Sequence, residues 1–260
     1  MILSALFILG TFWMLHPSGT ISIEPGKQLP QSVSIRVPDD GGSREETVHY
    51  MLFTPTQYDA EGQRWPLLLF LHGLGECGEN ENELERVKIH GPPKLVETRP
   101  DFPFVVVTPQ CPPPPGGMKD VPTAWKSEQL IQLVDHVSSN LRIDPSRVYV
   151  TGLSMGGYGT WRLAAAHPDH FAAALPICGG GEPAAMAAPL SGVPIWAFHG
   201  AGDKVVPLTE SQEMVDAVRR AGGQVRLTVY PDAEHDSWTR TYDNEEVYDW
   251  LLSHRRPLHE

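Results

Sequence analysis

The sequence predicts a doubly wound, mostly parallel α/β sheet, and three observations carry this prediction. Eight short runs rich in aliphatic, β-branched or aromatic residues follow one another along the chain. The run PLLLFLHG, residues 66–73, is almost entirely apolar, which is typical of a strand covered on both faces. The first two runs have the character of antiparallel strands, and helical patterns alternate with the later ones, as in a sheet covered by helices on both sides.

The predicted strands are residues 31–37, 47–55, 66–73, 104–110, 147–152, 171–180, 194–200 and 225–231. The predicted helices are one that carries Leu130, Val134, Val137 and Leu141 and stops near Asp144, one over residues 155–167, one over residues 209–221 and one that carries Val247, Tyr248, Leu251 and Leu252. A capping box formed by Thr209 and Gln212 is expected to open the third helix, and Gly222 to close it. About 14 residues separate the sixth and seventh strands, so we expect no large lid domain.

The chain is expected to hold an apolar lead-in, residues 1–27, and one catalytic domain, residues 28–260. The opening MILSALFILGTFWML has the length of a signal-peptide core and is shorter than a bilayer span. No Lys or Arg precedes it and no A-x-A site follows it. We expect a secreted or periplasmic protein without an integral membrane span after processing; the alternatives are a cytoplasmic protein or one anchored by this segment.

Composition excludes several classes of function. The net charge of −12 argues against a nucleic-acid partner. Hydrophobic residues make up 41% of the chain, enough for a sizeable core. The three cysteines have no zinc-type spacing, so neither a metal site nor a cofactor is expected. The acidic stretch from Glu76 to Arg86 is interpreted as a solvated loop and helix face.

The stretch TGLSMGGYGT, residues 151–160, joins a predicted strand to a predicted helix. One interpretation is a tight turn whose glycines only permit close packing. The other is a strained turn that exposes Ser154 as a nucleophile, because G-x-S-x-G between a strand and a helix is the nucleophile-elbow pattern. A serine hydroxyl needs a base that removes its proton and an acid that orients this base.

Two later strands end beside suitable partners for Ser154. Asp203 follows the strand PIWAFHG, and His235 follows VRLTVYP, which gives the chain order Ser, Asp, His. Asp232 and Asp236 are alternatives for the acid, although both are so near His235 in sequence that reaching its Nδ1 is sterically awkward. The two remaining candidate histidines, His72 and His199, are interpreted as loop braces.

The loop LHGLGECG, residues 71–78, is the third element of the predicted site. A tetrahedral intermediate carries an oxyanion that needs preorganised N–H donors. The backbone amides of Leu74 and Met155 are the predicted pair. The alternative for this loop alone is a plain glycine turn.

LFLHGLGECGEN, VYVTGLSMGGYGTW, FAAALPICGGG, IWAFHGAGDKVVP and HDSW, in this order, resemble the prolyl-oligopeptidase-like or phospholipase/carboxylesterase group of α/β-hydrolases. The group overlaps feruloyl- and acetyl-xylan-esterase-like enzymes. The resemblance implies the α/β-hydrolase fold, the triad Ser154, Asp203 and His235, and the oxyanion pair Leu74 and Met155. It implies a serine esterase; a serine peptidase and a non-catalytic binding protein of the same fold are the alternatives.

The substrate is expected to be a small-molecule or polysaccharide-linked ester with a small or aromatic acyl group. Trp125, at the end of the proline-rich loop 110–125, and Trp238 are predicted to border the cleft, the alternative being that the loop is only rigid. In the strand order of the resembled family, Cys77 and Cys111 belong to neighbouring strands and are the pair expected to meet. The alternative is three free thiols.

Overall fold

A computed structural model describes residues 21–39, 41–59 and 62–258. The apolar opening that predicts export, residues 1–15, lies outside these ranges. Within the described residues, no helix combines the length and the apolar character that crossing a bilayer requires.

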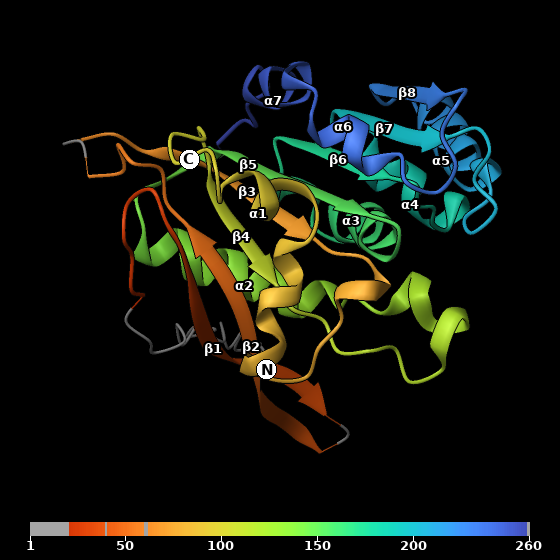
Figure 1. Ribbon diagram of the computed structural model, residues 1–260. Coiled ribbons are helices and arrows are strands. Elements are labelled where there is room, and N and C mark those ends of the chain that lie inside the picture. Colours follow the sequence, from red (N-terminus) through yellow and green to blue (C-terminus); the bar gives the residue numbers. More distant parts are fainter. Residues whose placement is uncertain (1–20, 40, 60–61, 259–260) are drawn as a thin grey trace, which may run out of the picture.

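Eight strands form one sheet in the order β1-β2-β4-β3-β5-β6-β7-β8 (Figure 1). Their bounds are β1 (Gln28–Asp39), β2 (Gly42–Phe53), β3 (Trp65–Leu71), β4 (Val105–Pro109), β5 (Ile143–Leu153), β6 (Ala173–Ile177), β7 (Ile195–Gly200) and β8 (Val225–Tyr230). The pairs β1–β2 and β2–β4 are antiparallel, and all the others are parallel. The predicted eight-stranded, mostly parallel sheet is therefore confirmed.

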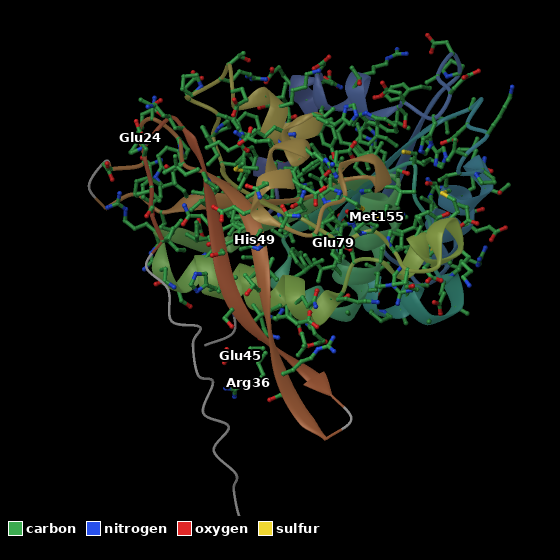
Figure 2. All side chains as sticks on the ribbon, turned by 60° about the horizontal axis from the view of Figure 1, so that its bottom comes forward. Glu24, Arg36, Glu45, His49, Glu79 and Met155 are labelled. Carbon is green, nitrogen blue, oxygen red and sulfur yellow. The ribbon has the colours of Figure 1, made fainter. Side chains whose placement is uncertain are left out.

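The two antiparallel strands at the edge form a long hairpin that extends beyond the rest of the sheet (Figure 2). Arg36 and Glu45 pair across its outer part. Every residue of β3 is buried, as its apolar run predicts for a central strand.

Helices cover both faces of the sheet. The longer helices are α2 (Ser127–Asn140), α3 (Met155–Ala166), α4 (Pro183–Leu190), α5 (Leu208–Arg220) and α7 (Glu245–Leu252). The shorter ones are η1 (Leu74–Glu76), η2 (Glu81–Lys88), α1 (Gly91–Leu95), η3 (Gly117–Thr123), η4 (Pro168–His170) and α6 (Trp238–Tyr242). One core cluster joins α2, α3, α4 and α5 to the sheet, and the other joins α1, α6 and α7. Each face of the sheet thus has its own apolar layer.

The start of α5 differs from the prediction. The helix begins at Leu208 with Pro207 as its N-cap, so Thr209 already lies inside the first turn and does not form the expected capping box. A proline fixes its own φ near the value that a helix entry needs, and the helix therefore starts one residue earlier. The predicted end is confirmed, since Gly222 takes a positive φ of 85° after the last turn.

Candidate active site

Ser154 occupies a sharp turn between β5 and α3. Its φ is 52° and its ψ is −115°, a backbone conformation that residues other than glycine rarely adopt. A Cβ on Gly156 would lie 1.9 Å from the Leu71 carbonyl oxygen, and one on Gly152 would lie 2.4 Å from the Gly156 oxygen. The glycines therefore let the end of β3 press directly against the turn, and this close packing holds the strained serine in place.

A chain of hydrogen bonds links three side chains from three different strand ends. His235 Nε2 lies 3.0 Å from Ser154 Oγ, and His235 Nδ1 lies 2.7 Å from Asp203 Oδ2. The loops after β5, β7 and β8 carry these residues, and the carboxyl ends of parallel strands meet at one edge of the sheet. The structure thus brings together the serine, the histidine and the acid that the sequence predicts as a triad.

The two carboxylate oxygens of Asp203 have separate partners. Oδ1 accepts the backbone N–H groups of Val205 and Val206 at 2.8 and 2.9 Å. Oδ2 faces His235 and also lies 3.3 Å from Nε2 of the buried His199. With its side chain fully buried, Asp203 is held in a single orientation.

The alternative acids are engaged elsewhere. Asp232 pairs with Arg240 at 3.0 Å, and Asp236 accepts hydrogen bonds from the backbone N–H and the hydroxyl of Thr239. These contacts lie at the start of α6, on exposed residues. Neither carboxylate is bonded to the ring of His235.

The two other histidines brace loops, as interpreted from the sequence. His199 contacts Ser211 Oγ at 2.8 Å and the Val206 carbonyl at 2.9 Å. His72 lies 2.6 Å from the Gly73 carbonyl through Nδ1, and its Nε2 accepts the Cys111 N–H at 3.0 Å. Burial lowers the pKa of His72 to about 4, so the ring is neutral and serves as donor and acceptor together.

Leu74 and Met155 stand at the first positions of η1 and α3. The first N–H groups of a helix have no acceptor within the helix, so both can donate to a ligand. The close approach of Gly156 to Leu71 and His72 sets the loop after β3 against the turn that holds Ser154. The two predicted oxyanion donors thus belong to backbone segments in direct contact.

Glu76 corrects the interpretation of the acidic stretch as wholly solvated. Only 6% of this residue is exposed, and its Oε2 accepts the Gly73 N–H at 2.9 Å, one residue before Leu74. Burial raises its pKa, while the charge of His90, 3.7 Å away, opposes the rise. The carboxylate thereby fixes the backbone that leads into the Leu74 amide. Its burial depends on contacts with residues distant in sequence, so the acidic run gave no sign of it.

The two predicted tryptophans lie in different places. The Trp238 ring meets the His235 ring edge-to-face at 5.2 Å between centroids and the His90 ring at 5.5 Å. Trp125 is buried, donates its indole N–H to the His72 carbonyl and packs on the His72 ring. Trp238 therefore stands beside His235, whereas Trp125 lies behind the loop that leads to Leu74.

The three cysteines are free and buried. Cys178 ends β6 with a φ of 39°, and its sulfur, with ligand atoms of Asp203 and His235, forms the one group of at least three metal-ligating side chains found close together in the described part of the chain. Asp203 and His235 already bond to each other and belong to the predicted triad, so the group overlaps that site. Cys77 and Cys111 lie near each other without a bond, which fits the alternative of three free thiols.

Comparisons with known proteins find similarity to a depolymerase and to esterases. The chain is 59% identical over 49 residues to poly(3-hydroxyalkanoate) depolymerase C of Paucimonas lemoignei, which covers 19% of the chain and 12% of that protein. It is 27% identical over 190 residues to a bifunctional acetylxylan esterase/xylanase of Neocallimastix patriciarum, which covers 71% of the chain and 26% of that protein. The chain thus spans about a quarter or less of the length of these two relatives.

The crystal structure of a thermostable esterase superposes with a TM-score of 0.66 at 32% identity, over 86% of this chain and 63% of the other. The family model that matches describes the dienelactone hydrolase family, and it covers residues 119–249, from within η3 into α7. This match includes Ser154, Asp203 and His235 and spans half of the 260 residues. The chain therefore belongs to the dienelactone hydrolase family.

Proposed function

We propose that the protein is a serine hydrolase that cleaves carboxylic esters through an acyl-enzyme intermediate. The observation that carries the proposal is the continuous hydrogen-bonded chain from Ser154 Oγ through the His235 ring to Asp203 Oδ2. Membership of the family and the similarity to esterases support it.

In the proposed reaction, Ser154 Oγ attacks the ester carbonyl carbon while His235 Nε2 takes the hydroxyl proton. The carbonyl oxygen becomes an oxyanion, and the N–H groups of Leu74 and Met155 donate to it. Collapse of this intermediate breaks the C–O bond, and the leaving alcohol receives the proton from His235. Water, deprotonated by His235, then hydrolyses the acyl-serine and releases the carboxylic acid. No metal or cofactor enters these steps.

The proposed substrates are esters with a small or aromatic acyl group, either as small molecules or linked to a polysaccharide. The name of the Neocallimastix relative supports the acetyl case. The edge-to-face pair of His235 and Trp238 supports the aromatic case, because a half-buried ring beside His235 offers a stacking surface. We also propose that the protein acts outside the cytoplasm, as the apolar opening suggests.

The test is hydrolysis of 4-nitrophenyl acetate by the purified protein and by two matched variants. Ser154→Ala should abolish both the burst and the turnover, since loss of a triad member costs several orders of magnitude in kcat. Ser191→Ala removes an exposed hydroxyl at the end of α4 and should behave like the parent. A Ser154→Ala protein with a tenth of the parent's turnover contradicts the proposal. A peptide 4-nitroanilide assayed in parallel distinguishes a peptidase.

A further inference from the structure

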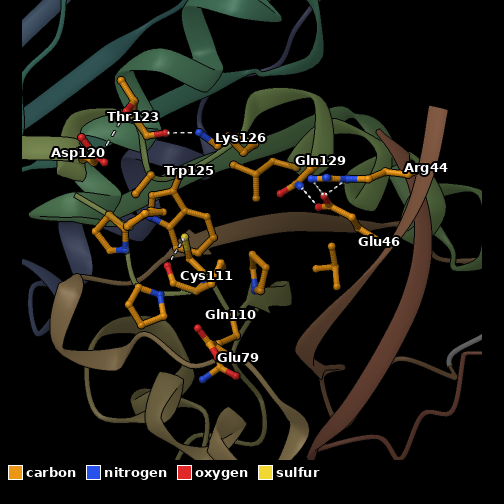
Figure 3. A pocket seen from close by; sticks show the side chains of 18 residues that line it. Arg44, Glu46, Glu79, Gln110, Cys111, Asp120, Thr123, Trp125, Lys126 and Gln129 are labelled. Atoms are coloured by element: carbon orange, nitrogen blue, oxygen red, sulfur yellow. Dashed lines mark hydrogen bonds and ion pairs between the residues drawn. The ribbon is translucent and has the colours of Figure 1, made fainter. Parts of the chain in front are cut away.

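A cavity of about 540 Å³ lies at the carboxyl end of β4, and no residue of the proposed triad lines it. Figure 3 shows the side chains that line it. Its walls come from β2, from the proline-rich loop and from the start of α2. A smaller cavity of about 310 Å³ shares Glu46, Glu79 and Gln110 with it, and we name the two together the β4 groove. The larger volume is within the range of about 300 to 1,000 Å³ that small-molecule sites occupy.

We propose that the β4 groove binds an uncharged carbohydrate that is joined to the ester bond cleaved at Ser154. The proposal rests on the proposed esterase function and adds to it a second binding site for the same substrate. The proposed steps of ester cleavage use no residue that lines this groove.

The place of the groove in the sheet sets its distance from the serine. β3 lies between β4 and β5, so the ends of β4 and β5 are two strand spacings apart, which is about 10 Å. One loop joins the two sites, because Leu74 provides an oxyanion donor and Glu79, five residues later, lines the groove. The Gly78 N–H donates to the Cys111 carbonyl at 3.1 Å and ties this loop to the wall of the groove. The groove continues from β4 toward β2, so a substrate needs at least two sugar units beyond the ester to reach it.

Four of the five charged side chains of the groove have partners within the protein, and the exposed Glu79 is the fifth. Arg44 donates to Glu46 at 2.8 Å, Asp120 accepts the Gly116 N–H at 2.7 Å, and Lys126 donates to the Thr123 carbonyl at 3.0 Å. With three carboxylates against two cations, the lining does not favour an anion. An uncharged ligand fits this balance best.

The remaining polar groups suit hydroxyl groups. Gln110 is 9% exposed and lines both cavities; its amide nitrogen donates to the Glu83 carbonyl, and its Oε1 has no partner among the described residues. An unpaired buried acceptor is costly, and if the carboxamide turned toward the groove a ligand hydroxyl would satisfy it. Prolines 112–115 and the edge of Trp125 add apolar surface for the C–H faces of a sugar ring. A carbohydrate provides both features at once.

The experiment compares two substrates, acetylated xylotriose and 4-nitrophenyl acetate, in the full chain. Thr123→Trp places a large side chain in the groove from an exposed position of its wall, and Glu79→Ala removes an acceptor. The ratio of kcat/KM for the xylotriose ester to that for 4-nitrophenyl acetate should fall at least tenfold for Thr123→Trp and about threefold for Glu79→Ala, mainly through KM. Thr209→Trp and Glu81→Ala, exposed residues outside the groove, should leave this ratio unchanged.

A ratio that does not move in Thr123→Trp, or that moves equally in Thr209→Trp, overturns the proposal. The proposal is also overturned if Thr123→Trp lowers kcat/KM for 4-nitrophenyl ferulate as much as for the xylotriose ester. That ferulate has no sugar, so the groove would then bind an acyl group. If the parent hydrolyses neither ester, the proposed function fails. Titration calorimetry with unesterified xylotriose then tests carbohydrate binding in the groove independently. Binding to the parent that is lost in Thr123→Trp supports the carbohydrate site, and no binding to the parent overturns it.

Discussion

The two carboxylate oxygens of Asp203 contact different partners, a loop and the proposed catalytic base His235. One oxygen closes the turn at Val205 and Val206, and the other holds the Nδ1–H of His235, so that Nε2 is left to face the serine. Asp203→Asn keeps the shape but presents an amide that can bind the wrong tautomer of the ring. We expect kcat on 4-nitrophenyl acetate to fall at least about 100-fold with little change in KM, because the loss lies in the transition state.

Asp232→Asn and Asp236→Asn serve as controls for this change. Both are exposed, and each already has a partner at or near α6. Their kcat values should stay within about tenfold of the parent's, because neither carboxylate contacts the His235 ring that changes charge in the transition state. A larger loss in Asp236→Asn than in Asp203→Asn would assign the orienting acid to Asp236.

Glu76 offers a test of how the oxyanion donors are positioned. Its carboxylate fixes the Gly73 N–H, and removal of a single oxyanion donor costs about 100-fold or more in kcat, so misplacing one should cost part of that. Glu76→Ala should lower kcat about tenfold with KM little changed, whereas Glu76→Gln, which keeps an acceptor, should stay within about threefold. Steady-state kinetics at one pH measure both. Equal losses in the two variants would mean that the charge, and not the hydrogen bond, matters.

At the level of single residues, the sequence located the groups whose position follows from strand ends. Ser154, Asp203 and His235 each follow an apolar run, and parallel strands carry such loops to one edge. Glu76 and the Gln110 amide were missed, because their burial depends on how the loop after β3 packs on the loop after β4. Sequence spacing does not encode that packing.

Among the elements, the turn between β5 and α3 depends on the absence of a side chain at Gly156. A Cβ there would lie 1.9 Å from the Leu71 carbonyl oxygen. This oxygen and the Gly156 Cα both belong to the backbone, which cannot move aside as a flexible side chain can. Gly156→Ala should therefore destabilise the protein by about 3 kcal/mol, at the upper end for overpacking, and lower esterase activity. Urea unfolding measures the loss of stability.

Gly192→Ala is the matched control, because a Cβ at Gly192 meets no atom within 4 Å. It should change the free energy of unfolding by less than about 0.5 kcal/mol, as is usual for surface sites. If both alanine variants prove equally stable, β3 does not constrain the turn as described.

The strands and the long helices were predictable because each buries a periodic apolar pattern. The helices η1, α1, η3, η4, α4 and α6 were not predicted, since their three to eight residues show no clear apolar period. The eight-residue α7 was predicted, because its apolar residues mark one face. The predicted capping box at Thr209 was wrong, because Pro207 is the N-cap and the helix begins before Thr209. The β4 groove also escaped prediction, as three distant segments form its walls.

For the molecule as a whole, Asp144 ties the start of β5 to the C-terminal segment. It accepts hydrogen bonds from Ser146 Oγ at 2.7 Å, from Arg147 at 2.7 Å and from Arg255 at 2.9 Å. Burial alone would raise the pKa of Asp144, but the hydrogen bonds from Ser146 and Arg147 outweigh it and lower the pKa to about 2. The network therefore favours the ionised carboxylate in the folded state.

This lowered pKa predicts acid sensitivity with a definite sign. The contribution is complete above the unfolded-state pKa of about 4 and is lost as the pH falls toward 2, because the unfolded state then binds the proton more readily. Asp144→Asn should lose about 2 kcal/mol of unfolding free energy at pH 6, and the gap to the parent should close between about pH 4 and 2. Urea titrations across that range check this. A gap that is independent of pH would exclude the carboxylate charge as its cause.

Because Cys77, Cys111 and Cys178 are buried, their rates of alkylation measure how often the fold opens. Burial raises the pKa values of these thiols to about 11, 12 and 12, so the folded protein holds almost no thiolate for an alkylating reagent. Cys77 and Cys111 lie in the loops after β3 and β4, whereas Cys178 directly follows the inner strand β6 and is fully buried. Iodoacetamide should therefore label Cys77 and Cys111 through local opening and Cys178 only at the rate of complete unfolding. Mass spectrometry over time would separate the two; uniform labelling would show that the sheet and its loops open as one unit.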